Sequence, residues 1–340
     1  MSAVVGIDLG GTKVAAAVLL DGSLSESHLL PTCLDSADQL VSQLVEIVGQ
    51  ARGAGPLDAV GVGVPSIIEF RTGRVVSSVN IPLADIPLRQ VLGEALGVPV
   101  FVDNDATVAA LAEAHDEDLR LVAHNLVMLT IGTGVGGGIV LGGRIFRGST
   151  GGAGELGHTL VALECDTDVP AAKDFPQAGS LEAMAAGHAL DRIAARIAAQ
   201  HPDSALGRRA AGGGEVTGVD VVDCALHGDL AAVAAVRRWA HLVGIGVANA
   251  INTFDPDEVV LGGGAARAGE LLLAPATEIA EGYVHPGLRG HARIRLARHG
   301  PRAGVLGAAL LAEQELTGGT RSHATPVAGT ELGGHRSART

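Results

Sequence analysis

The feature that most constrains this chain is a glycine-rich break between two apolar runs, which occurs twice. In Val4–Gly22 (VVGIDLGGTKVAAAVLLDG), an acidic residue and a Gly-Gly-Thr turn separate the two runs. This order predicts two antiparallel strands joined by a tight turn. The pattern recurs at Leu126–Gly143 (LVMLTIGTGVGGGIVLGG), where Ile131–Gly132 matches Leu9–Gly10. Two similar hairpins predict two similar lobes that face one nucleotide.

The first turn has the composition of a phosphate-binding loop. Gly10 and Gly11 have no Cβ atoms, so backbone N–H groups can converge on a phosphate oxygen. Lys13 adds a positive charge, and Asp8 supplies a carboxylate on which a metal ion could bind. The alternative interpretation is a purely structural turn, because glycine-rich hairpins are common.

The second turn resembles a dinucleotide-binding motif only superficially. Gly132, Gly134 and Gly137 fit the spacing G-x-G-x-x-G, but that motif must open into a helix. Here the glycines lead into IVLGGRIF, which predicts another strand. The Walker pattern G-x-x-x-x-G-K-[ST] occurs nowhere in the chain. Neither a Rossmann fold nor a P-loop is therefore expected.

The composition favours a protein of about two domains with an aliphatic core. The chain has 340 residues, of which 47% are hydrophobic but only 2% aromatic. Lys and Arg number 24 against 37 Asp and Glu, a net charge of −13. A nucleic-acid backbone would be repelled on average, so nucleic acid is excluded as the expected partner.

Cysteine usage and hydropathy indicate a cytoplasmic protein without a membrane partner. Cys33, Cys165 and Cys224 are too few and too scattered for a disulfide framework or a C-x-x-C site. The N-terminus lacks a basic segment followed by an apolar core, so no export signal is expected. Residues 121–143 carry no formal charge, but their many glycines would make a poor spanning helix.

Strand and helix patterns alternate in the first third of the chain. Ala37–Gln50 has helical periodicity, and Ala59–Pro65 predicts a buried strand. A strand over Val98–Val102 then delivers Asp105 to the start of a helix over Ala106–Ala114. Such a carboxylate can cap the helix, but the carboxyl end of a strand is also where α/β folds bind ligands.

The second half alternates glycine-rich segments with helices. In Gly148–His158, Glu155 and His158 are three residues apart, so a helical turn would put them on one face. We expect a loop over Leu163–Gly179 and a mobile connector at GRRAAGGG (207–214). The helical patterns are Leu181–Gln200, Val216–Leu226, Asp229–Phe254 and Ala303–Glu315, and a strand over Glu258–Leu261 ends in three glycines.

The motifs together resemble the ROK family of bacterial sugar kinases and sugar-responsive repressors, within the hexokinase–actin superfamily. The resemblance runs from about Val4 to Leu311 and rests on motif order and spacing. The pieces are DLGGTK (8–13), GVGVP (61–65), DNDA (103–106), GTGVGGGIV (132–140), GGAGELGH (151–158) and VVLGGG (259–264). Glucokinases are the family's commonest enzymes of this plain form.

The resemblance implies roles for individual residues. Asp105 would be the catalytic base that takes the proton from the sugar's primary hydroxyl as it attacks the γ-phosphoryl group of ATP. Asp8 would hold Mg²⁺, directly or through water. The sugar contacts would be Asn80, Asn104, Asp105, Glu155, His158 and Glu182. The phosphates would lie on Gly10, Gly11, Thr12, Lys13, Gly132, Thr133 and Gly134, and the adenosine beside Gly263 and Gly264.

The chain departs from the family pattern at three places. Ser66 replaces the glycine after GVGVP, and Thr107 replaces the usual Asn of NDAN. The family's zinc motif, C-x-C-G-x-x-G-C-x-E, is replaced by QAGSLE, with Ser180 at the position of the last cysteine. Because a structural zinc takes four ligands, usually thiolates and imidazoles, we expect no zinc site.

The expected fold is α/β, with two lobes built from duplicated ribonuclease-H-like domains and ATP and sugar in the cleft between them. Residues 1–110 with 303–316 would form the small lobe, 111–302 the large lobe and 317–340 a disordered tail. The expected activity is ATP-dependent phosphorylation of a hexose, glucose at its 6-hydroxyl in particular.

Two rival functions stay open at this point. One is a kinase for N-acetylmannosamine or N-acetylglucosamine. The other is a non-catalytic sugar sensor, although Asp8 follows Met1 so closely that no helix-turn-helix precedes it in this sequence. The family resemblance suggests a homodimer or homotetramer. The sequence leaves open the identity of the sugar and the use of polyphosphate in place of ATP.

Overall fold

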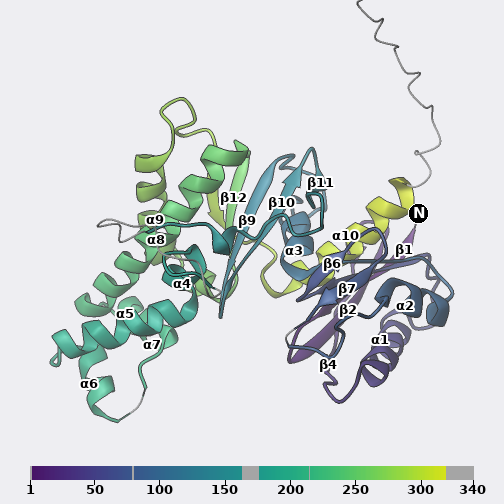
Figure 1. Cartoon of the computed structure of the whole chain (residues 1–340), viewed down its shortest axis with the longest axis horizontal. Helices are drawn as coiled ribbons and strands as arrows, with labels where there is room; N and C mark the ends of the chain where they lie inside the picture. The colour runs from purple at the N-terminus through teal and green to yellow at the C-terminus, as the bar shows by residue number, and fades with distance from the viewer. Residues whose placement is uncertain (1, 79, 163–175, 214, 319–340) are drawn as a thin grey trace, which may run out of the picture.

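Two β-sheets in separate halves of the molecule dominate the computed structural model of the chain (Figure 1). The structure describes residues 2–78, 80–162, 176–213 and 215–318. In the first sheet the strand order is β3-β2-β1-β5-β8, with β4 paired to β2. Its strands are β1 (Ala3–Leu9), β2 (Lys13–Leu20), β3 (Ser23–Leu24), β4 (His28–Pro31), β5 (Ala59–Val64) and β8 (Val100–Asn104).

The second sheet repeats this arrangement. Its order is β11-β10-β9-β12-β13, with an antiparallel hairpin β9/β10 followed by parallel pairings to β12 and β13. The first sheet pairs in the same directions. The strands are β9 (Leu126–Ile131), β10 (Val135–Leu141), β11 (Arg144–Ile145), β12 (Glu258–Gly262) and β13 (Arg293–Leu296). The two expected hairpins and the duplicated fold are therefore confirmed.

Helices cover both faces of the first sheet. The apolar faces of α1 (Ala37–Arg52) and α2 (Leu88–Leu96) pack on one side, together with buried residues such as Val5, Ile7 and Val62. The other side packs on α3 (Asp105–Glu113) and α10 (Ala303–Gly318). A separate hairpin, β6 (Ile67–Glu69) with β7 (Arg74–Ser77), follows β5.

The helices α3 and α10 lie between the two sheets (Figure 1). Glycines allow α10 to approach the first sheet at backbone distance. A Cβ atom on Gly6 would lie 2.1 Å from the carbonyl oxygen of Val305, and one on Gly61 would lie 1.8 Å from that of Ala308. Since real Cβ atoms do not come so close, only glycine fits at these two strand positions.

A cluster of helices covers the outer face of the second sheet. α8 and α9 pack together against β9 and β12, and α5, α7 and α8 contact one another beyond them. The helices are α4 (Leu181–Ala185), α5 (Gly187–Gln200), α6 (Ala205–Ala211), α7 (Gly218–Leu226), α8 (Leu230–Phe254) and α9 (Glu270–Tyr283). Short 3₁₀ helices are η1 (Leu156–His158), η2 (Gly264–Ala268) and η3 (Gly300–Arg302).

Three sequence predictions in this half need correction. The pattern over Leu181–Gln200 forms two helices, because Ala186 adopts an extended conformation between α4 and α5. The expected mobile connector contains α6, whose N-terminus is capped by the Ser204 hydroxyl. The final helix continues to Gly318, so the expected disordered tail would start later. Its residues 319–340 lie outside the described residues, as do 163–175 of the predicted loop.

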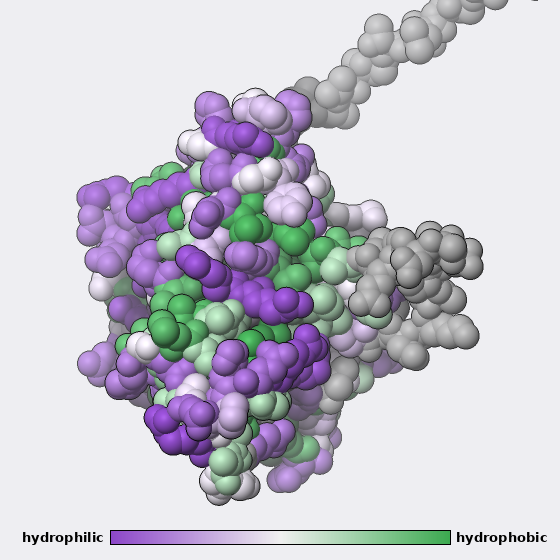
Figure 2. All heavy atoms as spheres, turned by 90° about the vertical axis from the view of Figure 1, so that its left-hand side faces the viewer, coloured by the Kyte–Doolittle hydropathy of each residue, from purple (hydrophilic) through white to green (hydrophobic). Residues whose placement is uncertain are grey.

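One helix, α8, is long and apolar enough to cross a membrane by length and composition alone. Half of its most apolar window is buried, and its side chains, including Trp239, pack against neighbouring helices. The face of the molecule at this end mixes hydrophilic and apolar residues rather than presenting one apolar surface (Figure 2). We therefore interpret α8 as a core helix.

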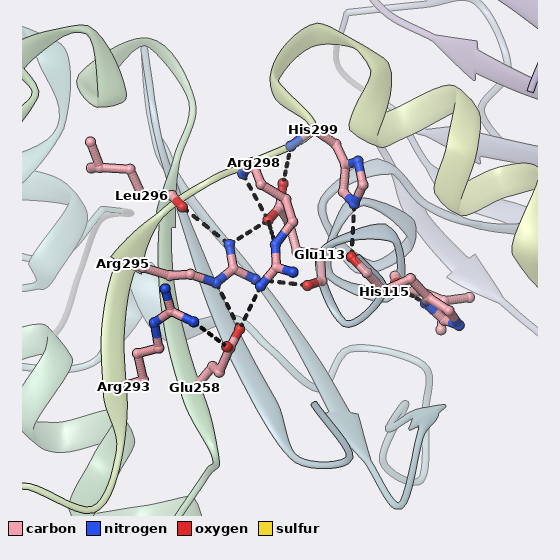
Figure 3. A network of polar contacts seen from close by, with 9 residues as sticks. Glu113, His115, Glu258, Arg293, Arg295, Leu296, Arg298 and His299 are labelled. Atoms are coloured by element: carbon pink, nitrogen blue, oxygen red, sulfur yellow. Dashed lines mark hydrogen bonds and ion pairs between the residues drawn. The ribbon is translucent and has the colours of Figure 1, made fainter. Parts of the chain in front are cut away.

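A buried network of charges ties α3 to the second sheet and to the segment that enters α10 (Figure 3). Glu113, the last residue of α3, is fully buried and accepts hydrogen bonds from Arg295 Nη1 at 2.6 Å and from the backbone N–H of His299 at 2.9 Å. Arg295 also donates from Nε to Glu258 at 2.7 Å. This polar cluster thus connects the end of α3 with β12, β13 and the segment that leads into α10.

Candidate active site

Two glycine loops lie at equivalent ends of the two sheets. Gly10 follows β1 and donates its backbone N–H to the Lys13 carbonyl at 2.9 Å. Gly132 follows β9 and donates to the Gly134 carbonyl, also at 2.9 Å. Thr12, Lys13 and Thr133 are exposed at the loop tips. Both loops therefore expose side chains at their tips, while several of their backbone groups are already hydrogen-bonded.

The second loop is held in place by the break between α4 and α5. Gly187 donates its backbone N–H to the Gly132 carbonyl at 2.7 Å, and His188 Nδ1 lies 3.1 Å from the Thr133 carbonyl. Glu182, on α4, accepts a hydrogen bond from the Val135 backbone N–H at 2.8 Å. The Glu182 carboxylate therefore lies at the end of the second loop, where β10 begins.

A cavity of about 340 Å³ opens beside the second loop. Gly263 and Gly264 follow β12 at its edge, and Gly263 has a φ of 76°, a conformation that favours glycine. A Cβ atom on Gly263 would also lie 2.5 Å from the Ile131 carbonyl oxygen. The cavity is lined by Gly132, Thr133, His188, Asp191, Thr217, Gly218, Trp239, Gly264, Ala265 and Arg267, among others.

Most of this cavity was not predicted from the sequence. Asp191 accepts a hydrogen bond from the Gly218 backbone N–H, which joins α5 to the start of α7 at the cavity wall. Trp239 is 2% exposed and donates from Nε1 to the Ala185 carbonyl at 2.6 Å. Neither residue belongs to a motif, so only the fold brings them to the cavity.

Asp105 lies where β8 passes into α3. The prediction that it caps the helix is wrong, because the cap is Asn104, whose Oδ1 accepts from the Thr107 backbone N–H at 3.1 Å. Asp105 is the first residue of the helix, and its carboxylate accepts from the Ala106 N–H at 2.8 Å. Burial raises the pKa of Asp105, with these hydrogen bonds opposing the shift. A carboxylate that gains a proton more readily than usual suits a general base.

Asp8 lies near Asp105 at the carboxyl ends of the strands. Burial, together with the Asp105 charge, raises the pKa of Asp8 to about 6, and Lys13 opposes this shift. Gly304, in the first turn of α10, leaves room for the Asp8 carboxylate, since a Cβ atom there would lie 2.4 Å from Asp8 Cγ. Two partly buried carboxylates that repel one another would both gain from a divalent cation.

A small cavity between the lobes contains several predicted sugar contacts. It is lined by Ser66, Ile67, Asn104, Thr107, Gly137, Gly151, Gly152, Ala153 and Glu155. Glu155 Oε2 lies 3.6 Å from His158 Nε2, as their spacing led us to expect. Asn80 lies elsewhere, beside the first loop, where its Cβ is 3.5 Å from the position of a Cβ on Gly11. The predicted sugar residues thus do not form one cluster: Asn104 and Glu155 line this cavity, whereas Asn80 lies beside the first loop.

A model of the ROK family matches residues 4–315. The chain belongs to the ROK family. A ROK relative named glucokinase, from Halalkalibacterium halodurans, is 35% identical over 92% of this chain and 95% of its own length. An N-acetyl-D-glucosamine kinase from Escherichia coli O6:H1 is 33% identical over 90% of this chain and 98% of its own.

Solved ROK structures share the fold. A ROK family glucokinase from Streptomyces griseus, in complex with glucose and AMPPNP, superimposes with a TM-score of 0.74 at 30% identity. The match covers 92% of this chain and all of the other. The two-lobed actin/hexokinase-like architecture expected from the sequence is therefore confirmed.

Two carboxylates, Asp8 and Asp105, have the chemistry of Mg²⁺ ligands. Mg²⁺ is usually held by one or two carboxylates together with waters and substrate phosphates, which matches Asp8 and its neighbour Asp105. Across the part of the chain that the structure describes, no group of three or more His, Cys, Asp and Glu side chains could hold a metal ion. Cys165, the remaining thiol near the family's zinc motif, lies outside the described residues.

Proposed function

We propose that this ROK protein is an ATP-dependent kinase that phosphorylates a hexose, glucose at its 6-hydroxyl in particular. The observation that carries the proposal is the pair of partly buried carboxylates, Asp8 and Asp105, at the strand ends near the first glycine loop. The similarity to glucokinases along nearly the whole chain supports the same activity.

In this mechanism Asp105 takes the proton from the sugar hydroxyl as that oxygen attacks the γ-phosphoryl group. Its raised pKa brings the carboxylate nearer to the pH at which it must accept a proton. Phosphoryl transfer depends mainly on positioning and charge stabilisation. Mg²⁺, when bound, would neutralise phosphate oxygens, and Asp8 would hold it directly or through water.

The remaining residues bind and orient the two substrates. Backbone N–H groups of Gly10–Lys13 and Gly132–Gly134 would hold phosphate oxygens, with the Lys13 ammonium adding charge. The cavity beside Gly264 would hold the adenosine. Asn80, Asn104, Glu155 and His158 would bind sugar hydroxyls. Glu182 would bind sugar only after its carboxylate leaves the Val135 N–H, which would couple the sugar to the phosphate loop.

We also propose how the lobes act. Residues 1–110 with 303–316 would move as one body and 111–302 as another, closing on the sugar and excluding water. Small-angle scattering should report a smaller radius of gyration with saturating glucose. An unchanged radius would contradict closure. A cytoplasmic location and a homodimer or homotetramer are part of the same proposal, and sedimentation equilibrium would test the assembly.

A coupled ADP-release assay with ATP and Mg²⁺ tests the activity. Glucose, mannose, N-acetylglucosamine and N-acetylmannosamine should be compared, and polyphosphate should be tried as donor. We expect glucose to have the highest kcat/KM. A higher value for an acetamido sugar would favour an amino-sugar kinase. This second candidate function is supported by the 33% identity to an N-acetyl-D-glucosamine kinase.

The fluorescence of the single tryptophan can report nucleotide binding separately from catalysis. Trp239 is the only tryptophan of the chain and lines the nucleotide cavity. Its fluorescence should therefore change when ATP binds. If the protein binds sugar, but ATP does not change the Trp239 fluorescence and no ADP is released, the protein is the non-catalytic sensor. This result would contradict the kinase proposal.

We further propose that catalysis needs Mg²⁺ but no zinc. Activity in excess Mg²⁺ should survive a zinc-selective chelator, and metal analysis of the purified protein should find less than one zinc per chain. Stoichiometric zinc whose removal abolishes activity would contradict this proposal.

A further inference from the structure

Ser66 carries a buried hydroxyl with no hydrogen-bond partner among the described residues. The residue is 8% exposed, and its Oγ is fully shielded from solvent. Ser66 closely follows β5, and both its backbone N–H and its backbone carbonyl are hydrogen-bonded. Its N–H donates to the Val64 carbonyl at 2.8 Å, and its carbonyl accepts from Asn104 Nδ2 at 3.3 Å. The hydroxyl is therefore the polar group of Ser66 that remains to be satisfied.

The surroundings of this hydroxyl are those of the small interlobe cavity. Ser66 lines it together with Asn104, Thr107 and Glu155. The Asn104 amide is fixed in orientation, because its Oδ1 accepts from the Thr107 backbone N–H at 3.1 Å and lies 3.4 Å from the Thr107 hydroxyl. Its Nδ2 therefore faces Ser66. Residues with hydroxyl, amide and carboxylate side chains thus line one small space.

We propose that Ser66 determines which sugar this enzyme accepts, by hydrogen-bonding one ring hydroxyl of the hexose and excluding larger groups from that position. The inference deepens the proposed hexokinase function and rests on it. Ser66 would bind a hydroxyl other than the one that is phosphorylated, because Asp105 takes the proton from that one.

The unsatisfied hydroxyl favours a polar ligand at this position. A buried hydroxyl without a partner destabilises the protein, and a sugar hydroxyl would relieve that cost on binding. A site built to hydrogen-bond a substrate hydroxyl rejects an analogue that lacks it, because its own polar group is then left unpaired. Ser66 therefore selects for the hydroxyl as well as binding it.

The small size of the cavity adds a steric contribution to sugar selectivity. The space open to the centre of a water molecule is about 10 Å³ in this partly open cavity. This is on the order of the space that one water molecule requires. A hydroxyl fits in such a space, whereas an acetamido group at the same ring position would need Ser66 or Thr107 to move. The cavity thus favours a plain hexose over an acetamido sugar.

The test uses Ser66→Ala and Ser66→Gly with glucose, its 2-, 3- and 4-deoxy analogues and N-acetylglucosamine. We expect Ser66→Ala to lower kcat/KM for glucose about tenfold, mainly through KM, as one lost hydrogen bond would do. With the one deoxy sugar that lacks the contacted hydroxyl, wild type and variant should have equal kcat/KM. Ser66→Gly should raise kcat/KM for the acetamido sugar relative to glucose by about tenfold or more, given the added space.

Two controls separate recognition from folding. Removing an unsatisfied hydroxyl should leave the unfolding midpoint unchanged or raise it. Ser78→Ala removes another buried serine hydroxyl without a partner in the described chain, but one that does not line the cavity. It should leave the order of preference among the sugars unchanged.

Kinetics that change by the same factor for every deoxy sugar, or by less than twofold for all of them, would overturn the role of Ser66. If the wild-type protein phosphorylates none of these sugars, the proposed function fails instead. Calorimetric glucose binding would then still test Ser66, since Ser66→Ala must weaken it about tenfold. Unchanged glucose affinity would contradict the inference.

Discussion

Arg147 donates a 2.7 Å hydrogen bond from Nε to Oδ2 of Asp103, whose side chain is only 3% exposed. Arg147 follows β11 in the second lobe, whereas Asp103 lies in β8 of the first, directly before Asn104 and Asp105. The Arg147 guanidinium also lies 3.4 Å from the centre of the Phe70 ring. This pair holds the start of the glycine-rich segment that leads to Glu155 against the strand that carries the proposed base.

Replacing Arg147 with Met should destabilise the protein by about 3–5 kcal/mol, because the buried Asp103 carboxylate loses its partner. Burial already raises the pKa of Asp103, and Arg147 opposes that rise. Without Arg147 the pKa of Asp103 rises further, so the loss of stability should be larger at pH 8 than at pH 5. Urea denaturation at both pH values measures it.

The matched control is the double variant Arg147→Met with Asp103→Asn, in which the unpaired charge is also removed. It should recover part of the lost stability. A double variant that is less stable than Arg147→Met alone would contradict the assignment of the effect to an uncompensated carboxylate.

Replacing Asp105 with Asn should lower kcat by at least ~10²-fold while sugar affinity stays within a few fold, since Asn cannot accept the proton. Because Asn104 and not Asp105 caps α3, the free energy of unfolding should not fall. Turnover comes from the ADP-release assay and affinity from calorimetry. Near-normal turnover would remove Asp105 from the role of base.

Replacing Asp8 with Asn should stabilise the metal-free protein at pH 7.5. The pKa of Asp8 is raised in the folded state from 3.8 to about 6, so its favourable contribution is complete below pH 4 and is lost as pH rises through 6. The shift corresponds to roughly 3 kcal/mol at neutral pH, which the Asn variant would not lose.

Thermal melting of the wild type and of Asp8→Asn, without and with Mg²⁺, tests this expectation. With a nucleotide analogue present, Mg²⁺ should raise the unfolding midpoint of the wild type and have much less effect on Asp8→Asn. Asp8 of the metal-free protein becomes protonated as pH drops through about 6, so activity at limiting Mg²⁺ should fall there. Equal Mg²⁺ stabilisation of both proteins would place the ion elsewhere.

Replacing Glu113 with Gln should cost about 3–5 kcal/mol of stability, because Arg295 would lose a fully buried carboxylate at 2.6 Å. Asp118→Asn is the control, since its ion pair with Arg120 is largely exposed and should contribute less than about 1 kcal/mol. Thermal melting of both variants measures the difference. Similar losses in the two variants would contradict a special role for this buried polar cluster.

The parts of the fold that follow from local periodicity could be predicted from the sequence. Both hairpins, α1, α2, α3 and α8 follow directly from apolar spacing and glycine punctuation. The break at Ala186 could not, because it depends on Gly187 reaching the Gly132 carbonyl far away in the chain. The missed helix α6 had a usable signal in Ser204, a good helix cap, which the following glycines obscured.

The site was predictable where motifs mark it and unpredictable where it depends on packing. Asp105 and Asn104 are adjacent and both can cap a helix, so only the strand pairing of Val64 with Asn104 fixes which one does. Arg147 and Trp239 reach their sites through tertiary structure alone, whereas Ser66 directly follows the GVGVP motif. The roles of the predicted residues and the boundaries of the lobes stay predictions until the variants above are measured.

The position of α10 has a consequence for how the protein is made in the cell. Gly6 and Gly61 fit against Val305 and Ala308 so closely that the first sheet cannot bury that face until α10 is present. The ribosome synthesises the whole second lobe in between, which at about 5–20 residues per second takes on the order of 10 to 40 s. During that time the first sheet is incomplete, and chaperones that shield apolar surface on nascent chains should bind it. Translation speed across the second lobe should therefore influence the yield of folded protein.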